Sequence, residues 1–216
     1  PTGTNTGRFS SKKPNLQNIG RGKLRTCFIP DKGHRLVVAD YSQVELRIAA
    51  AIAGEEKMIQ AYAQGSDLHR QTASIVLGKP VENISKEDRQ LAKAVNFGLL
   101  YGQSAKGLVR YAETSYGVKL DTEQAWQICR KFFDEYKHLR EWHSQAKKDA
   151  GSNCEVLSTK LGRKRWLPVE GDVQWQRFTA LLNAPVQGGA ADVIKTAIIA
   201  LQAKLPEDAG LVSTVH

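Results

Sequence analysis

The chain has 216 residues, a formal net charge of +9 and 41% hydrophobic residues. These values favour a folded protein of one large or two small domains. No run of about 18 apolar residues occurs, which excludes an ordinary membrane-spanning helix. The three cysteines, Cys27, Cys129 and Cys154, lie far apart without C-x-x-C spacing. This disfavours a disulfide framework or a zinc knuckle and fits a reducing cytosol.

The basic residues are clustered. Eight Lys or Arg residues lie between Arg8 and Arg35, opposed only by Asp31, and a second cluster spans residues 160–165. Clustered positive charge is typical of a polyanion-binding surface, with nucleic acid as the default partner, although a solvated basic face is the alternative. The first residues are polar and contain no apolar stretch of the kind found in a signal peptide, so we expect a cytoplasmic protein. They also lack a starting Met, which indicates an excerpt from a longer chain.

Taken in chain order, glycines and prolines predict irregular structure over the first thirty residues. A buried strand is then expected over residues 34–40, ending at Asp40. A helix follows over 42–54, with Ser42 as its N-cap and Gly54 at its end. The next helix begins at Ser66 or Asp67 and ends at Leu77.

The rest of the chain is predicted to be mostly helical, with a hairpin and a final strand. Ser85 and Asp88 form a capping-box pattern at the start of a helix through residue 100 or so. Strands near both ends with helices between them predict an α+β fold, a sheet interrupted by a helical insertion. The further predicted elements are helices over 104–116, 121–150, 173–182 and 185–205, a hairpin of 154–159 and 163–168, and a strand over 211–216.

Residues 89–102 carry the most informative pattern. Read as a helix, they align two cations and two aromatic residues along one face, because a step of four nearly completes a turn. Such a stripe suits a nucleotide, although an amphipathic core helix with basic edges is an equal alternative. Gly98 and Gly102 are costly in a helix and indicate close approach of a ligand or another backbone. The stripe consists of Arg89, Lys93, Phe97 and Tyr101.

Three further residues could carry chemistry. Asp40 follows an apolar strand pattern and could bind a metal, although a turn or N-cap role is as common. Glu45 lies in the first turn of the next helix, where it could simply interact with the helix dipole. His69 lies near a helix start that could accept a phosphate, although an ordinary exposed histidine is the alternative.

As an ordered set, five segments resemble family A DNA polymerases of the bacterial polymerase I type. Residues 37–47, VVADYSQVELR, resemble motif A, and residues 89–102, RQLAKAVNFGLLYG, resemble motif B. Residues 6–19, 67–73 and 183–192 also match, in the expected order, so that the resemblance covers essentially the whole chain.

The resemblance implies a polymerase palm of antiparallel sheet with a mostly helical fingers insertion. We expect palm at residues 1–53, with motif A, fingers at 54–182, with motif B, and palm again at 183–216. The final Val-His resembles the start of motif C, so this fragment is expected to lack the second acidic pair and to be inactive alone.

The resemblance implies template-directed DNA synthesis, in which deoxynucleoside triphosphates are added to a primer 3′-hydroxyl. Two Mg²⁺ ions, with Mn²⁺ as a substitute, are expected to clamp the attacking and leaving oxygens. The expected partners are primer–template DNA and the nucleotides, without a membrane, and the protein is expected to be a monomer.

By the same resemblance, Asp40 and the backbone carbonyl of Tyr41 are expected to bind metal. Arg89, Lys93 and His69 are expected to hold the triphosphate, with Lys93 also neutralising or protonating the leaving pyrophosphate.

The resemblance also implies roles at the sugar and at the DNA. Glu45, assisted by Tyr101, is expected to exclude a ribose 2′-hydroxyl, and Phe97 is expected to pack against the sugar and base. The residues expected to touch primer–template near the growing end are Arg8, Gln17, Asn18, Asn183, Gln187 and His216.

The sequence departs from the family pattern at two positions. Thr179 stands where an Arg is usual, four residues before Asn183; Arg177 is nearby, and Gly20 replaces a usual Pro. A single-subunit RNA polymerase is one alternative, against which Glu45 argues. A non-catalytic nucleic-acid-binding protein derived from a decayed polymerase and an inert partial fold are the others.

Overall fold

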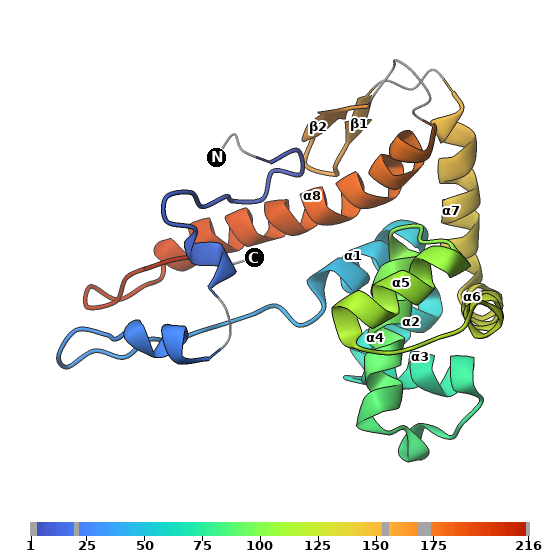
Figure 1. Cartoon of the computed structure of the whole chain (residues 1–216). Coiled ribbons are helices and arrows are strands. Elements are labelled where there is room, and N and C mark those ends of the chain that lie inside the picture. Colours follow the sequence, from blue (N-terminus) through green and yellow to red (C-terminus); the bar gives the residue numbers. More distant parts are fainter. Residues whose placement is uncertain (1–3, 20–21, 153–155, 168–173, 215–216) are drawn as a thin grey trace.

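A computed structural model describes residues 4–19, 22–152, 156–167 and 174–214. Helices α1 to α6 form a body, α7 runs along its edge, and α8 crosses beside it (Figure 1). None of the described helices combines the length and apolar character needed to cross a bilayer. The α-helices are α1 Val44–Ala53, α2 Glu56–Ala63, α3 Leu68–Leu77, α4 Lys86–Leu100, α5 Ala105–Tyr116, α6 Thr122–Glu135, α7 Lys137–Ala150 and α8 Gln174–Gln202.

The remaining regular structure is short. The strands β1 Val156–Ser158 and β2 Lys164–Trp166 pair in antiparallel fashion, with Leu157 opposite Arg165. This hairpin lies within the predicted one; residues 154, 155 and 168 lie outside the described chain. Three 3-10 turns complete the list: η1 Leu16–Asn18, η2 Lys23–Cys27 and η3 Val81–Asn83.

Local capping explains where four of the eight described α-helices begin. The side chain of Asp67 accepts hydrogen bonds from two backbone N–H groups of α3, and Ser104 accepts one in α5. Ser85 with Asp88, and Asp121 with Gln124, form reciprocal capping boxes at α4 and α6. These caps satisfy N–H groups that have no partner within the helix, so the helix starts follow from the local sequence.

The main core draws residues from all the helices α1 to α8, and from Tyr136 between α6 and α7. Large side chains that are fully or almost fully buried fill it, including Leu46, Leu99, Leu108, Phe132 and Tyr136. A second cluster joins α7 to α8. The body of helices therefore has an interior of its own, against which the candidate site is built.

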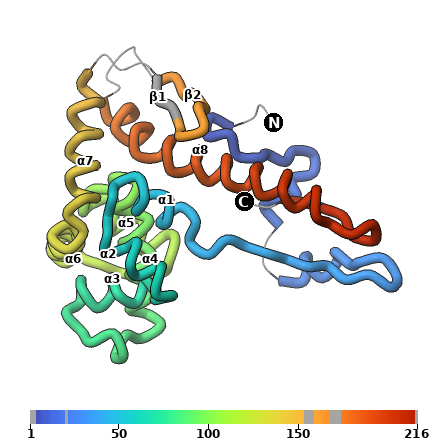
Figure 2. The backbone as a smooth tube through the Cα atoms, turned by 180° about the vertical axis from the view of Figure 1, so that it is seen from behind, coloured from blue at the N-terminus to red at the C-terminus, as the bar shows by residue number. Residues whose placement is uncertain are grey.

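The strand expected at residues 34–40 is absent, and no strand occurs in residues 211–214. The side chains of Val37 and Val38 are 90% and 92% exposed. A strand needs hydrogen-bonded neighbours, and the segment before α1 extends away from the helices without one (Figure 2). The described sheet is therefore limited to the hairpin, and the chain is mostly helical.

The prediction of a single long helix over residues 121–150 is wrong, because the chain bends at Tyr136 between α6 and α7. Tyr136 has φ −100° and ψ 74° and is buried in the core. The buried carboxylate of Glu55 accepts a hydrogen bond of 3.0 Å from the backbone N–H of His138, in the first turn of α7. Glu55 thus supplies a cap from a distant part of the chain, which a local pattern could not reveal.

Other boundaries also differ from expectation. Helix α8 is continuous through Pro185, where two helices were predicted, and buried neighbours on both sides hold this turn against the rest of the molecule. Gln43, with φ 55°, precedes α1 in place of Ser42, whereas Gly54 ends the helix as predicted. Helix α2 was not predicted.

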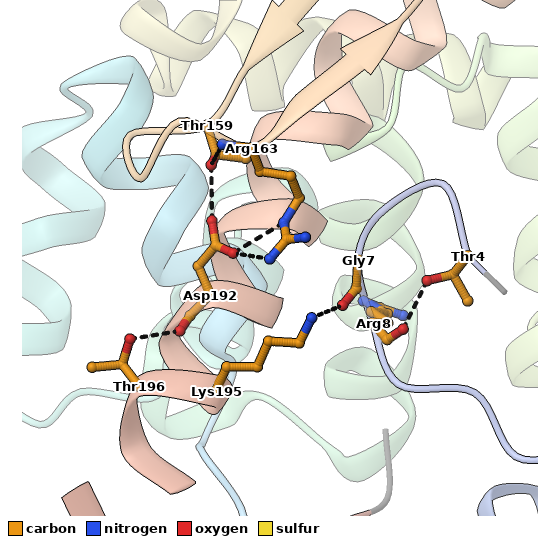
Figure 3. Close-up of polar contacts among 8 residues, drawn as sticks. All are labelled: Thr4, Gly7, Arg8, Thr159, Arg163, Asp192, Lys195 and Thr196. Carbon is orange, nitrogen blue, oxygen red and sulfur yellow. Dashed lines mark hydrogen bonds and ion pairs between the residues drawn. The ribbon is translucent and has the colours of Figure 1, made fainter. Parts of the chain in front are cut away.

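Helix α8 also anchors the hairpin turn and the N-terminal segment (Figure 3). The carboxylate of Asp192 accepts hydrogen bonds from Thr159 and Arg163, at 2.8 and 3.0 Å. One turn further on, the ammonium of Lys195 donates a hydrogen bond of 2.6 Å to the carbonyl of Gly7. Two segments far apart in sequence are thereby held on the same helix.

Candidate functional site

The predicted stripe lies on α4 as far as Phe97, and Tyr101 is the residue that ends the helix. Arg89 donates a hydrogen bond of 2.7 Å from Nε to Oδ2 of Asp67. Although burial acts to raise it, the hydrogen bond and charge of Arg89 hold the pKa of Asp67 below its usual value. Lys93 is half-buried, and its ammonium has no hydrogen-bond or ion-pair partner among the described residues.

His69 lies beside this stripe but is buried, contrary to the exposed alternative. Its ring centroid is 6.0 Å from that of Phe97, and its Nδ1 lies 2.9 Å from the side-chain nitrogen of Asn96. Burial first, then the positive charge of Arg89, lowers the pKa of His69 to about 4. His69 is therefore a neutral imidazole at pH 7.

A second group of predicted residues meets at the end of α4. Tyr101 donates a hydrogen bond to the carboxylate of Glu45, which also forms an ion pair with Arg8. Burial raises the pKa of Tyr101 to about 12, against the opposing effects of a hydrogen bond with Gln187 and the charge of Arg8. Four elements, namely the N-terminal segment, α1, α4 and α8, thus place polar groups at one point.

The predicted metal residues lie apart from these contacts. Asp40 and Tyr41 are exposed at the end of the extended segment that precedes α1. The described residues contain no group of three or more Asp, Glu, His or Cys side chains that could together hold a metal ion. A carboxylate and a backbone carbonyl are oxygen ligands of the type that Mg²⁺ and Mn²⁺ prefer, so the donor chemistry fits these ions.

The remaining predicted DNA-binding residues are distributed over two elements. Gln17 and Asn18 lie in the exposed turn η1, and no contact joins them to the groups above. Asn183 and Gln187 are one turn apart on α8, and Oδ1 of Asn183 is buried and has no hydrogen-bond partner within the described part of the chain. His216 lies outside the described residues.

Thr179, at the position where the family usually has Arg, and the nearby Arg177 make different contacts in the structure. Thr179 directs its hydroxyl back to carbonyls of its own helix, at Trp175 and Gln176. Arg177 is buried and donates hydrogen bonds of 2.9 and 2.7 Å to the carbonyls of Ala150 and Ser152, after the end of α7. In this structure Arg177 therefore fixes the connection from α7.

Sequence reasoning missed the buried polar residues behind the stripe. Thr72 and Asn96 are fully buried, and Asn96 contacts both Thr72 and His69. The available signal was an amide on the apolar face of α4, between Ala92 and Leu99. A polar group in such a position needs a partner, but the sequence does not say which one.

The model of DNA polymerase family A matches residues 1–216 of this chain. The chain is 44% identical to DNA polymerase I of Aquifex aeolicus, over 99% of this chain and 36% of that protein. It is 38% identical to the thermostable DNA polymerase I of Thermus aquaticus, over 95% of this chain and 25% of that protein. The chain thus spans about a third or less of these relatives.

The solved polymerase domain of Pol1 from M. smegmatis, in complex with DNA primer-template and dNTP, has a similar fold. The TM-score is 0.78 at 35% identity, and the match covers 93% of this chain and 36% of that one. The motif order, the helical fold and these matches agree over nearly the full length. The chain belongs to DNA polymerase family A.

Proposed function

We propose that the residues of the candidate site form the nucleotide site and part of the primer–template surface of a template-directed DNA polymerase. The observation that carries the proposal is the face of α4, where Arg89, Lys93 and Phe97 follow one another beside a neutral His69. Two cations and a hydrogen-bond donor suit a triphosphate, and an aromatic ring suits a sugar and base.

The ion pair with Asp67 supports a binding role for Arg89. Oδ2 of Asp67 accepts a hydrogen bond from the Nε–H group of Arg89 and thereby orients the guanidinium. The two terminal amino groups remain for phosphate oxygens. Lys93 supplies a second, unpaired charge one helical turn further on, and it is the group that would neutralise or protonate the departing pyrophosphate.

The proposed metal ligands are Asp40 and the carbonyl of Tyr41. Bound Mg²⁺ would neutralise charge on the transferring phosphoryl group and lower the pKa of the attacking hydroxyl. Phosphoryl transfer needs mainly positioning and charge neutralisation. In this proposal α4 holds the nucleotide, and Asp40 and the Tyr41 carbonyl hold the metal ions.

At the opposite end of the stripe, the pair of Glu45 and Tyr101 supports discrimination between sugars. We propose that the carboxylate occupies the space of a ribose 2′-hydroxyl, which favours DNA over RNA synthesis. The proposed primer–template contacts are Arg8, Gln17, Asn18, Asn183, Gln187 and His216.

The proposed division is palm at residues 1–53 and 183–216, and fingers at 54–182. The proposed palm contains an antiparallel sheet. Because the chain spans only 36% and 25% of two relatives, we expect it not to extend a primer alone.

The test compares Lys93→Ala with Lys119→Ala in a full-length polymerase that contains these residues. Lys119 is an exposed lysine between α5 and α6, so its replacement makes the same charge change elsewhere. Single-turnover extension against nucleotide concentration should show, for Lys93→Ala, weaker nucleotide binding and a rate lower by about tenfold or more. Equal behaviour of the two variants would reject the proposed triphosphate site.

A further inference from the structure

A buried chain of polar side chains leads to His69 from the opposite side of the stripe. The hydroxyls of Tyr136 and Thr72 lie 3.1 Å apart, and Thr72 donates a hydrogen bond of 3.1 Å to Oδ1 of Asn96. The amide nitrogen of Asn96 lies 2.9 Å from Nδ1 of His69. The exposed fractions of Thr72, Asn96, Tyr136 and His69 are 0%, 0%, 2% and 3%.

The direction of this chain is fixed at its Tyr136 end. Among the described residues, the hydrogen-bond partner of the Tyr136 hydroxyl is Thr72. The buried phenolic O–H group must therefore donate its hydrogen bond to the Thr72 oxygen. The hydroxyl of Thr72 then donates to the oxygen of Asn96, and the amide N–H of Asn96 points at His69. Nδ1 of His69 is therefore an acceptor, and its ring proton resides on Nε2.

The reverse orientation of the Asn96 amide is less favourable. Nδ1 of His69 would then donate to the amide oxygen, and the amide would donate to Thr72. The Asn96 amide would then offer Thr72 only a donor, so either the hydroxyl proton of Thr72 or that of Tyr136 would have no acceptor among the described residues. An unsatisfied buried donor costs about 1–3 kcal/mol, which favours the first orientation strongly.

We propose that Asn96, oriented by Thr72, is a positioning residue that fixes His69 as the neutral Nε2–H tautomer, with this N–H donating to a phosphate oxygen of the incoming nucleotide. The inference rests on the proposed function for its second half. Nε2 has no hydrogen-bond partner among the described residues, so it is available to a ligand.

The charges around His69 suit a neutral donor. Burial, Arg89 and Lys93 all disfavour a positive charge on His69, and Asp67, the N-cap residue of α3, opposes them with a smaller effect than that of burial or of Arg89. The phenol of Tyr136, beyond Thr72, remains protonated because burial raises its pKa to about 12. The site thus combines two permanent cations with one uncharged, directed N–H group.

The first experiment measures the tautomer directly, without nucleotide. Long-range proton–nitrogen spectra of the chain labelled with ¹⁵N-histidine distinguish a protonated ring nitrogen from a bare one, and His69→Gln assigns the signals. We expect a protonated Nε2 and a bare Nδ1 at pH 7. A protonated Nδ1 at this pH overturns the proposal and leaves the proposed polymerase function untouched.

Asn96→Asp tests whether Asn96 imposes this state. A carboxylate keeps the shape and the bond from Thr72 but can only accept from His69, so Nδ1 should become protonated. Retention of a bare Nδ1 in the folded variant overturns the proposal.

An uncharged pair of variants provides a second test if Asn96→Asp does not fold. Thr72→Val removes the hydroxyl that orients the amide, whereas Thr72→Ser retains it. We expect both tautomers in Thr72→Val and the Nε2–H tautomer in Thr72→Ser. Identical spectra of the two variants contradict the role of Thr72.

Titration with dATP tests the second half of the inference. Binding should shift the Nε2–H signal, and Thr72→Val should raise the dissociation constant severalfold relative to Thr72→Ser, since loss of a bond to a charged group costs about tenfold when complete. If dATP shifts the Nε2–H signal but the two variants have the same dissociation constant, the positioning role is rejected. No shift of His69 at saturating dATP rejects its phosphate contact.

Discussion

Glu45 illustrates how the structure sharpens a residue that the sequence describes only weakly. A glutamate in the first turn of a helix is common, and its position alone is compatible with a dipole interaction. Its contacts with Arg8 and Tyr101 come from segments far apart in the chain, and they hold the carboxylate at the end of the stripe. A held carboxylate can act as a steric block.

Replacement of Glu45 should change the choice of sugar. In a full-length polymerase with this sequence, Glu45→Ala should raise ribonucleotide incorporation relative to deoxyribonucleotide by about tenfold or more, if the block is worth at least 1.4 kcal/mol. Glu45→Gln keeps the volume and should change the ratio much less. Competition between the two nucleotides at one template base measures the effect.

An unchanged ratio in Glu45→Ala would show that Glu45 is only a carboxylate at the start of a helix, paired with Arg8 and Tyr101. The assignment to DNA rather than RNA synthesis would then lose its main support at this site.

At the same scale, the sequence predicted the arrangement of residues along one helix face better than the buried contacts between helices. The stripe of Arg89, Lys93 and Phe97 follows from a local period of four, which the helix preserves. The contacts of Asn96 join residues 24 and 27 positions apart, and no local period encodes them. Their discovery needed the packing of α3 against α4.

Among the helices, the boundaries set by local chemistry were predicted and those set by distant partners were not. Ser85, Ser104 and Asp121 cap their own helices, so their sequence patterns were sufficient. The bend at Tyr136 depends on Glu55, and the strand at residues 34–40 depends on neighbours that the described chain does not provide. Tertiary contacts decided these cases.

The glycines of motif B also act at the level of helix packing. A Cβ on Gly98 would lie 3.1 Å from Leu108 and 3.2 Å from Tyr111, which belong to α5. Gly102 has φ +81°, and its Cβ would lie 2.6 Å from Phe178 of α8. The sequence predicted close approach of a ligand or another backbone, whereas the neighbours of both glycines in the structure are side chains of other helices.

Gly102→Ala should therefore destabilise the chain more than a glycine replacement with the same backbone strain. Gly117, with φ +68° and nothing within 4 Å of its Cβ, is the matched control. Backbone strain should cost about 1–2 kcal/mol in both variants, and the contact with α8 should add about 1–3 kcal/mol in Gly102→Ala. Urea unfolding measures both; equal losses would mean that α8 does not pack on the end of α4 in solution.

For the whole molecule, the fold family and the helical middle of the chain were predicted, whereas the strands predicted near the two ends do not occur in residues 34–40 and 211–214. The expected sheet rested on apolar runs at residues 34–40 and 211–216. Val37, Val38 and Val212 in these runs are almost fully exposed. An apolar run predicts burial only where the molecule provides a surface to bury it against, and the sequence pattern carries no information about that surface.

The net charge of +9 gives a prediction for the entire chain. Binding of a primer–template duplex should weaken with salt, because each phosphate neutralised releases counterions and adds about 0.9 to the slope of log affinity against log salt. Fluorescence anisotropy with labelled duplex at several salt concentrations gives this slope. If the N-terminal basic segment lies on DNA, Lys12→Ala combined with Lys13→Ala should lower the slope by up to about 2.

The pair Lys137→Ala and Lys148→Ala on α7 makes the same change in net charge, at exposed positions away from the candidate site, and should leave the slope nearly unchanged. Equal reductions by both pairs would mean that the whole charge, rather than the proposed surface, attracts the duplex.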